Sequence, residues 1–353
     1  MPILSAQDFA LAARELLDSR VWDFIEGGSG AEINLEANRH LFDTAQIRPR
    51  VLVDVSTCDT TSTLFGDRLP SPLGIAPTAY HRMVHNEGET ATAQGAGGTP
   101  FVVSIFASRT LEEIAKNATG PLWLQLYWLQ RRAVLADLAK RAHDAGYRAL
   151  MLTVDAPRIG RRMRDLRNDF GIPAHLRAVN IDPDLMTSTY QGDGIAKHAA
   201  HTFDQTITWA DLAWLRSLTD LPLVLKGVLT AEDAALAIDH GVDAIVVSNH
   251  GGRQLDGAVP SLAALPEVAA AVDGRCPVLL DGGIRGGRDI FIALALGASA
   301  VLIGRPALWA LAAGGAKGVE QLLSMLTGEL EHTMALAGRP RIDDINRSAL
   351  WSS

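Results

Sequence analysis

Residues 278–305 read VLLDGGIRGGRDIFIALALGASAVLIGR, and this stretch decides the fold class. Val278–Asp281 and Ala300–Gly304 are short apolar runs of strand length, and the segment between them is long enough for a helix. Both runs consist almost entirely of Val, Leu, Ile and Ala, as expected for parallel strands that are covered on both faces. The stretch therefore predicts a strand–helix–strand unit of an α/β protein.

Six further runs of the same kind precede this unit. They are Leu73–Pro77, Phe101–Ser104, Leu122–Tyr127, Ala149–Asp155, Leu223–Lys226 and Ala244–Ser248. Helix-start patterns occur between them: Thr110 with Glu113 forms a capping box, and Thr230 precedes an acidic first turn. Eight such units in succession predict a closed (β/α)8 TIM barrel and disfavour an open, doubly wound sheet.

The segments outside this rhythm complete a single predicted domain over residues 1–353. Residues 1–70 form a helical extension, with amphipathic helices at Ser5–Leu17, around Trp22 and at Glu32–Phe42, followed by a Pro- and Thr-rich connection. The barrel occupies residues 71–340. Residues 156–208 form a long insertion after the fourth strand, and such insertions are usually active-site loops. Its polar centre, at about residues 182–205, predicts a mobile lid.

Composition excludes several classes of function. The formal net charge of −8 argues against binding of nucleic acid or of an anionic membrane through bulk charge. Cys58 and Cys276 are too few for a disulfide framework and lack the spacing of a metal site. The first residues do not resemble a signal peptide, and no apolar stretch approaches the length of a membrane span. We expect a soluble, cytoplasmic protein.

Nearly every predicted strand ends in residues that can form hydrogen bonds. In chain order these ends are Pro77 with Thr78, Ser104, Gln125 with Tyr127, Thr153 with Asp155, Lys226, Ser248 with His250, Asp281 to Gly283, and Gly304 with Arg305. The carboxyl ends of barrel strands converge on one mouth. These groups are therefore expected to share one polar pocket.

The last two of these ends predict a phosphate site. The segments 281–287 and 303–305 combine glycines with Arg285 and Arg305, at the two loops where barrels commonly hold a phosphate. Glycine permits close approach of the backbone N–H groups, and arginine pairs with phosphate through two parallel hydrogen bonds.

The other charged residues at the mouth are candidates for catalysis and for substrate binding. Lys226 ends an apolar strand, and three roles remain open for it: a Schiff-base nucleophile, an ion-pair partner, or a charge beside an electron-rich cofactor. His250, directly after a strand, is a candidate general base. Arg162 and Arg253 add two cations near the same mouth, which in an acidic protein indicates an anionic substrate.

Several motifs resemble those of one known family along nearly the whole chain. These motifs are Ser248-Asn-His-Gly-Gly-Arg-Gln-Leu-Asp256, Ala76-Pro-Thr-Ala79, Gln125-Leu-Tyr127, Thr153-Val-Asp155, Leu225-Lys-Gly227 and Leu280-Asp-Gly-Gly283. They are similar to those of the FMN-dependent 2-hydroxy-acid oxidases and dehydrogenases, which include the glycolate and lactate oxidases and mandelate dehydrogenase. The resemblance implies that the cofactor is FMN and that the reaction converts a 2-hydroxy acid to a 2-oxo acid.

The resemblance also implies roles for individual residues. His250 would take a proton from the substrate while Asp155 orients it, Arg162 and Arg253 would hold the carboxylate, and Tyr127 would bind the substrate oxygens. Lys226 would stabilise negative charge on the reduced flavin. The residues implied to contact the rest of FMN are Ala76, Pro77, Thr78, Ser104, Gln125, Thr153, Ser248, Asp281, Gly283, Arg285, Gly304 and Arg305.

Two departures from the glycolate oxidase pattern bear on the substrate. Phe24 and Phe106 stand where those members carry Tyr and Trp, and together with Ala79 they are expected to line an apolar pocket that suits an aryl side chain. The segment 22–30 and the stretch 125–129 are similar to 4-hydroxymandelate oxidases. We therefore expect (S)-mandelate or 4-hydroxymandelate as substrate. Aliphatic 2-hydroxy acids such as lactate or glycolate are the alternative.

The resemblance further implies a homotetramer. The membrane-binding insert of mandelate dehydrogenase is absent, which favours a soluble oxidase that uses O2. A dehydrogenase with another electron acceptor is the alternative. Two rival functions remain at this point. One is a flavin-free, phosphate-binding isomerase or aldolase with Lys226 as nucleophile, and the other is a barrel that binds FMN without catalysis.

Overall fold

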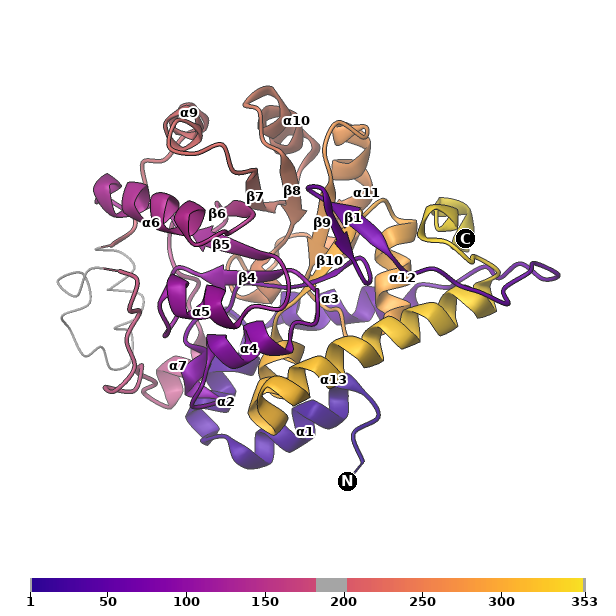
Figure 1. Cartoon of the computed structure of the whole chain (residues 1–353), viewed down its shortest axis with the longest axis horizontal. Helices are drawn as coiled ribbons and strands as arrows, with labels where there is room; N and C mark the ends of the chain where they lie inside the picture. Colours follow the sequence, from indigo (N-terminus) through magenta and orange to yellow (C-terminus); the bar gives the residue numbers. More distant parts are fainter. Residues whose placement is uncertain (1, 182–201, 352–353) are drawn as a thin grey trace.

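Eight parallel strands close into a barrel at the centre of the molecule (Figure 1). The computed structural model describes residues 2–181 and 202–351. The barrel strands are β3 (Leu73–Ile75), β4 (Phe101–Ser104), β5 (Leu122–Leu126), β6 (Ala149–Thr153), β7 (Leu223–Val228), β8 (Ala244–Val247), β9 (Val278–Asp281) and β10 (Ala300–Ile303). Each strand pairs with its neighbour along the chain, and β10 pairs with β3. The predicted (β/α)8 architecture is confirmed.

The strand boundaries differ from the predicted ones by one or two residues. Tyr127, Asp155 and Ser248 lie just beyond strands that were predicted to include them. Conversely, β7 continues past Lys226 to Val228, through an irregularity in its pairing with β8. The polar residues therefore lie at the carboxyl ends of the strands or directly after them.

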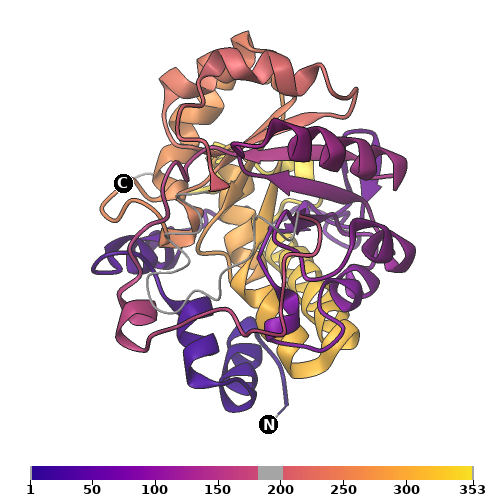
Figure 2. The same cartoon turned by 90° about the vertical axis from the view of Figure 1, so that its left-hand side faces the viewer.

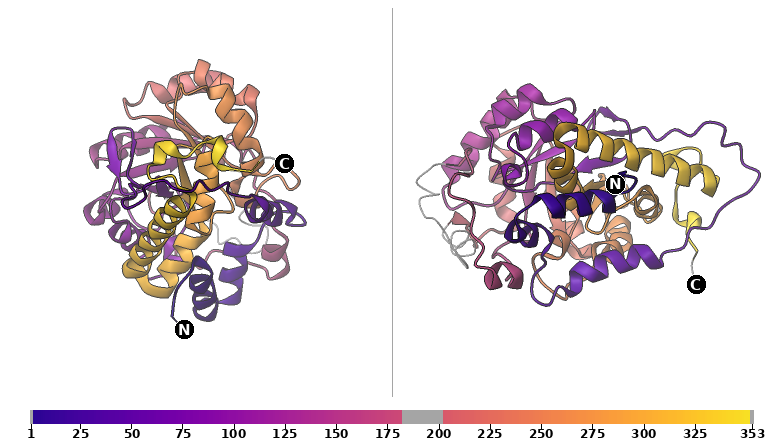
Figure 3. Two further views of the ribbon diagram at one scale, coloured as in Figure 1. Left: turned by 90° about the vertical axis from the view of Figure 1, so that its right-hand side faces the viewer. Right: turned by 90° about the horizontal axis from the view of Figure 1, so that it is seen from below.

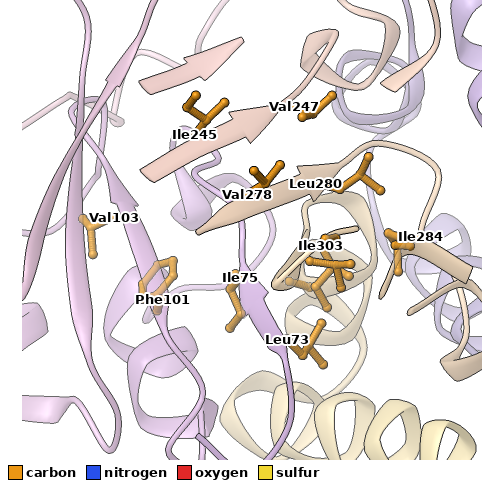
Figure 4. Packing of buried hydrophobic residues seen from close by; sticks show 14 of the residues in the cluster. Leu73, Ile75, Phe101, Val103, Ile245, Val247, Val278, Leu280, Ile284 and Ile303 are labelled. Carbon is orange, nitrogen blue, oxygen red and sulfur yellow. The ribbon is translucent and has the colours of Figure 1, made fainter. Parts of the chain in front are cut away.

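Side chains alternate between the inside of the barrel and its outer surface. Inward-facing apolar residues form one cluster, which includes Val102, Trp123, Met151, Val224 and Leu279. Their strand neighbours form a second cluster between the strands and the surrounding helices, and Figure 4 shows part of it around Ile75, Val103, Val247, Leu280 and Ile303. This two-residue period is that of a strand that is buried on both faces. It also means that the last inward position of each strand faces the mouth of the barrel.

A short hairpin closes the opposite, amino-terminal end of the barrel. It consists of β1 (Ser62–Leu64) and β2 (Asp67–Leu69), which pair antiparallel. Leu64 and Leu69 pack into the inner cluster, and the ring of Phe65 lies 5.3 Å from that of Trp123. The sequence predicted only a connection here, because the two strands are too short to show a period.

Helices surround the barrel and confirm the alternating pattern. Their bounds are α1 (Ala6–Leu16), α2 (Ser19–Glu26), α3 (Ile33–Thr44), α4 (Glu89–Gly95), α5 (Leu111–Asn117), α6 (Arg132–Asp144), α7 (Met163–Arg167), α9 (Leu212–Arg216), α10 (Ala231–Asp239), α11 (Ser261–Val272), α12 (Gly287–Ala295) and α13 (Arg305–Ala337). Short 3-10 turns are η1 (His81–Met83), η3 (Trp209–Asp211), η4 (His250–Gly252), η5 (Ile342–Asp344) and η6 (Arg347–Ala349). The capping box of Thr110 and the cap at Thr230 are both present.

The amino-terminal helices pack on the barrel in two different ways. Helix α1 lies along α13, as the view from below shows (Figure 3). Helix α13 is interrupted at Gly315. Helix α2 lies beside α7 of the insertion, on the face seen in Figure 2. Within residues 2–181 and 202–351, no helix has both the length and the apolar character needed to cross a membrane.

Candidate active site

A cavity of about 650 Å³ opens at the carboxyl ends of the barrel strands. Its lining includes, of the residues predicted for the site, Phe24, Ala76, Pro77, Thr78, Ala79, Ser104, Phe106, Gln125, Tyr127, Thr153, Arg162, Lys226, His250, Arg253, Asp281, Gly283, Arg285, Gly304 and Arg305. Asp155 and Ser248 lie behind this lining and contact residues in it. The polar strand ends therefore converge on one cavity, as the sequence predicted.

His250 is held in one orientation by two contacts. It follows β8 with a left-handed backbone (φ 58°), which is strained for a residue with a Cβ, and the glycines behind it also have positive φ. Its backbone N–H donates to Ser248 Oγ at 3.0 Å, and its Nδ1 lies 2.9 Å from Asp155 Oδ1. A proton on Nδ1 that is donated to this carboxylate leaves the Nε2 lone pair as the basic position of the ring.

Asp155 is ionised and buried. Burial opposes its ionisation, but the imidazole of His250 and the ammonium of Lys226 outweigh burial and hold the pKa of this carboxyl below its ordinary value. Gly227 makes room for it: a Cβ at Gly227 would lie 2.6 Å from the Asp155 Cβ, and the backbone there has φ +112°. Gln254 donates to the Asp155 carbonyl at 3.0 Å.

Lys226 is an ion-pair partner in the wall of the cavity. Its Nζ lies 2.9 Å from Asp281 Oδ2 and donates to Ser248 Oγ at 2.9 Å. Burial disfavours the ammonium, yet Asp281 and Asp155 raise the pKa of Lys226 above its ordinary value. A Schiff-base nucleophile must lose this proton. The aldolase hypothesis for Lys226 is therefore disfavoured.

Four partly buried guanidinium groups line the cavity, those of Arg162, Arg253, Arg285 and Arg305. Burial lowers the pKa of each group, that of Arg285 to about 10 and that of Arg253 well below the ordinary value. Repulsion between neighbouring arginines adds to this effect for Arg253, Arg285 and Arg305. A nearby carboxylate, that of Asp165, lies 4.0 Å from Arg162. Such a concentration of buried positive charge calls for anions in the cavity.

Two of these arginines also fix helix α2. Arg253 Nη1 donates to the carbonyls of Phe24 and Gly27, at 2.7 and 2.6 Å. Arg305 donates to the carbonyls of residues 25, 26, 27 and 251. The last carbonyls of a helix lack partners within the helix and attract cations. The sequence predicted that Arg305 holds the cofactor, and it gave no indication of this second contact.

Phe24 is enclosed by these groups. Its ring stacks on Phe170 at 4.6 Å between centroids, and the guanidinium carbons of Arg253 and Arg162 lie 5.1 and 5.6 Å from its centroid. Positive charge over an aromatic face is favourable. The carboxyl end of α2 thus contributes an aromatic ring to the cavity wall beside Arg162 and Arg253.

A second group of rings forms another part of the wall. Tyr127 lies 5.7 Å from Phe106 and stacks on Phe203 at 4.6 Å, while Phe106 lies 6.1 Å from Phe203. Burial raises the pKa of Tyr127, so its hydroxyl keeps the proton and remains a donor. Phe203 also lines the cavity but was not predicted as a site residue from the sequence. The signal in the sequence that could have identified it is the presence of an aromatic residue at the end of a polar insertion.

The described part of the insertion contributes to the cavity wall. Residues 172–174, 176–179 and 181 line the cavity, and Arg177 among them adds a cation on the exposed side. The predicted lid at residues 182–205 lies largely outside the described residues, which resume at 202. Within the described part of the chain, no group of His, Cys, Asp and Glu is arranged to bind a metal ion.

The donor set of the cavity fits FMN. The guanidinium groups of Arg285 and Arg305 and the glycine backbone at 283 and 304 line the region beside β9 and β10, where a phosphate is expected. Asp281 Oδ1 is buried and has no hydrogen-bond partner, which suits a ribityl hydroxyl donor. Gly283 has φ +87°, and a Cβ there would lie 2.5 Å from the Asn38 carbonyl, so this backbone approach requires glycine.

Comparison with known proteins identifies close relatives of the whole chain. The family model described as FMN-dependent dehydrogenase matches residues 13–352. The chain is 47% identical to the 4-hydroxymandelate oxidase of Amycolatopsis orientalis over 342 residues, covering 96% of this chain and 95% of that protein. It is also 47% identical to an L-lactate oxidase of a Nostoc species, with 97% and 96% covered. A crystal structure of mandelate oxidase with (S)-4-hydroxymandelic acid superposes with a TM-score of 0.94 at 46% identity, covering 99% of this chain and 98% of that one.

Proposed function

Because the chain belongs to the FMN-dependent dehydrogenases, we propose that it oxidises an (S)-2-hydroxy acid with an aryl side chain, mandelate or 4-hydroxymandelate, to the 2-oxo acid. FMN, when bound, accepts the two electrons that leave C2. The observation that carries the proposal is the position of His250: it is paired with an ionised carboxylate and lines the same cavity as the partly buried Arg162 and Arg253.

The roles proposed for the polar residues follow from their contacts. His250 takes a proton from the substrate at Nε2, and Asp155 stabilises the imidazolium that results, because its carboxylate lies against Nδ1. Arg162 and Arg253 pair with the substrate carboxylate, since both are cations of the cavity wall whose nearest acidic neighbour, Asp165, lies 4.0 Å from Arg162. Tyr127 donates its phenolic proton to a substrate oxygen.

The remaining groups hold the cofactor in this proposal. Arg285 and Arg305 would hold the phosphate, Asp281 would accept from a ribityl hydroxyl, and Lys226 would supply a fixed positive charge to the reduced flavin. The side chains proposed to surround the isoalloxazine and ribityl parts are those of Thr78, Ser104, Gln125 and Thr153, together with Ala76 and Pro77. Ser248 positions Lys226 by accepting a hydrogen bond from its ammonium. A preorganised cation stabilises charge that develops during the reaction without further rearrangement.

The aryl substrate is supported by the aromatic walls of the cavity. Phe24, Phe106 and Tyr127 present ring faces and edges that favour an aromatic side chain, and Ala79 leaves space beside them. An aliphatic 2-hydroxy acid is the second candidate, because the lactate oxidase relative is as similar to this chain as the hydroxymandelate oxidase is.

We propose O2 as the electron acceptor, with two electrons and two protons converting it to H2O2, since the relatives are named oxidases. We also propose a homotetramer. The side chains of Val51, Leu52, Leu336 and Trp351 are apolar and exposed, as in surfaces that contact another copy. Val51 and Leu52 belong to the connection between α3 and β1, which extends away from the barrel (Figure 3). The cytoplasmic location remains a prediction from the sequence.

Anaerobic mixing tests this function. The yellow holoprotein is mixed with (S)-mandelate, 4-hydroxymandelate, L-lactate and glycolate in turn, and flavin absorbance is followed by stopped flow. We expect the aryl acids to bleach the flavin fastest, and air to restore the colour with formation of H2O2. Absence of bleaching with all four acids would refute the proposal. Faster bleaching by lactate or glycolate would instead support the aliphatic alternative.

A further inference from the structure

The insertion after β6 returns to the barrel through a clasp with the segment that follows β5. Leu129 and Phe203 form an antiparallel bridge, Gln130 N donates to the Thr202 carbonyl at 3.0 Å, and Asp204 N donates to the Trp128 carbonyl at 2.8 Å. These bonds join residues more than seventy positions apart in the sequence. The backbone of residue 203 is therefore fixed relative to Tyr127, which directly precedes the clasped segment.

Side chains reinforce this clasp. Arg132 Nη2 pairs with Asp204 Oδ2 at 2.5 Å, Arg132 also donates to the Leu129 carbonyl, and its guanidinium carbon lies 4.0 Å from the centroid of the Trp128 ring. Gln130 Nε2 donates to the Phe203 carbonyl at 3.2 Å. A partly buried ion pair with several hydrogen bonds fixes a position more firmly than a solvated pair.

The clasp directs the Phe203 ring into the cavity wall. Phe203 is buried, lines the cavity and stacks on Tyr127 at 4.6 Å with an angle of 25° between the rings. Its ring also lies 6.1 Å from that of Phe106. Three aromatic rings, from the segment after β5, from the loop after β4 and from the end of the insertion, therefore enclose one corner of the cavity.

This corner adjoins the group proposed to bind the substrate oxygens. Tyr127 is that group, so the side chain on C2 of a bound 2-hydroxy acid lies near the rings that surround Tyr127. An aromatic side chain gains from offset or edge contacts with such rings beyond the burial of its area, whereas a methyl group gains little.

We propose that Phe203 is a specificity-determining residue, which selects aryl over small aliphatic 2-hydroxy acids by forming the third ring of this corner. The inference rests on the proposed function, because it concerns the side chain of the substrate of that reaction. Phe203 contacts the side chain, and the clasp formed by residues 128–130 and 202–204 keeps its ring in place.

The test compares Phe203→Leu and Phe203→Tyr with the unchanged holoprotein. Single-turnover flavin reduction gives rate and apparent affinity for (S)-mandelate and for L-lactate. Phe203→Leu is expected to lower the mandelate-to-lactate ratio of these efficiencies by about five- to tenfold, because one aromatic contact is lost. Phe203→Tyr keeps the ring and is expected to keep the ratio.

Phe170→Leu is the matched control. Phe170 also lies on the insertion, is buried to a similar extent and stacks at 4.6 Å on a cavity ring, that of Phe24, but it does not line the cavity. We expect it to leave the ratio within about twofold. Bound-flavin absorbance and thermal unfolding of each variant establish that it is folded and loaded.

The outcomes separate this inference from the function on which it rests. If the unchanged protein is reduced by both acids but Phe203→Leu leaves the ratio intact, or raises it, the inference is wrong and the function stands. An equal fall of the ratio in Phe203→Leu and Phe170→Leu also refutes it, because the effect would then not be specific to the wall. If neither acid reduces the unchanged protein, the proposed function has failed.

Discussion

The imidazole Nδ1 of His250 and the carboxylate Oδ1 of Asp155 lie 2.9 Å apart, although 95 positions separate the two residues in the sequence. The barrel brings them together because β6 and β8 both flank β7, and Asp155 and His250 follow the carboxyl ends of β6 and β8. Gly227, near the end of β7, has no side chain and therefore leaves room for the side chain of Asp155.

Replacement of Asp155 by Asn tests the value of this pair. The amide keeps the shape but loses the negative charge that stabilises a protonated His250, so flavin reduction should slow by about 10²- to 10⁴-fold. Stopped-flow reduction by a saturating 2-hydroxy acid measures the rate. Asp220→Asn makes the same change at an exposed position and should react at the original rate. A rate for Asp155→Asn within threefold of the original would rule out this role.

Replacement of Gly227 by Ala should disturb the same pair through the backbone. The new Cβ would lie 2.6 Å from Asp155, at a φ that residues with a side chain rarely adopt, so we expect a loss of about 1–3 kcal/mol in unfolding free energy and much slower flavin reduction. Gly241→Ala is the control, since its φ is also positive (+70°) but nothing lies within 4 Å of the new Cβ. Denaturant unfolding and flavin reduction should both distinguish the two variants.

Replacement of Lys226 by Met removes the buried ammonium. Because the pKa of Lys226 is raised in the folded protein, its contribution to stability is fully present below the unfolded pKa of about 10.4 and is lost as pH rises through the higher folded value. The variant should therefore lack this part of the alkaline loss of stability, measured by thermal unfolding from about pH 9, where the contribution is intact, to values above about pH 10.4, where it is being lost.

The same variant should also reduce its flavin about 10²- to 10³-fold more slowly, because a fixed charge proposed to stabilise the reduced flavin is lost. Lys317→Met, at an exposed position on α13, is the control for both measurements. An unchanged reduction rate in Lys226→Met with flavin bound would show that this ammonium serves the fold alone.

Replacement of Phe106 by Trp probes the space for the substrate. The larger ring would occupy part of the corner beside Tyr127, 5.7 Å away, so the efficiency with (S)-mandelate should fall by about tenfold while that with glycolate stays within about twofold. Initial rates of H2O2 formation over a range of substrate concentrations give both values. Phe106→Leu removes bulk instead and should not reproduce the pattern. Equal losses for both acids in Phe106→Trp would contradict this reading of the pocket.

Most of the fold was predictable because apolar runs and helical stretches are local patterns. The strand ends were predictable for the same reason: Gln125, Thr153, Lys226 and Asp281 stand at inward positions after apolar residues, where a polar side chain is compatible with the fold only at the open mouth. The hairpin at residues 62–69 was not predicted. Three-residue strands carry no measurable period, and their burial depends on Trp123 in the distant strand β5.

The sequence by itself determined the barrel, the polar mouth and the motifs that resemble the FMN-dependent family, because each depends on residues near one another in the chain. Only the tertiary structure decided how Arg253 and Arg305 divide their donors between the cavity and the carbonyls of α2, and that Phe203 stacks on Tyr127. The physical reason is that a guanidinium group or an aromatic ring can satisfy many partners equally well. Which partner it meets is set by the packing of segments that lie far apart in the sequence.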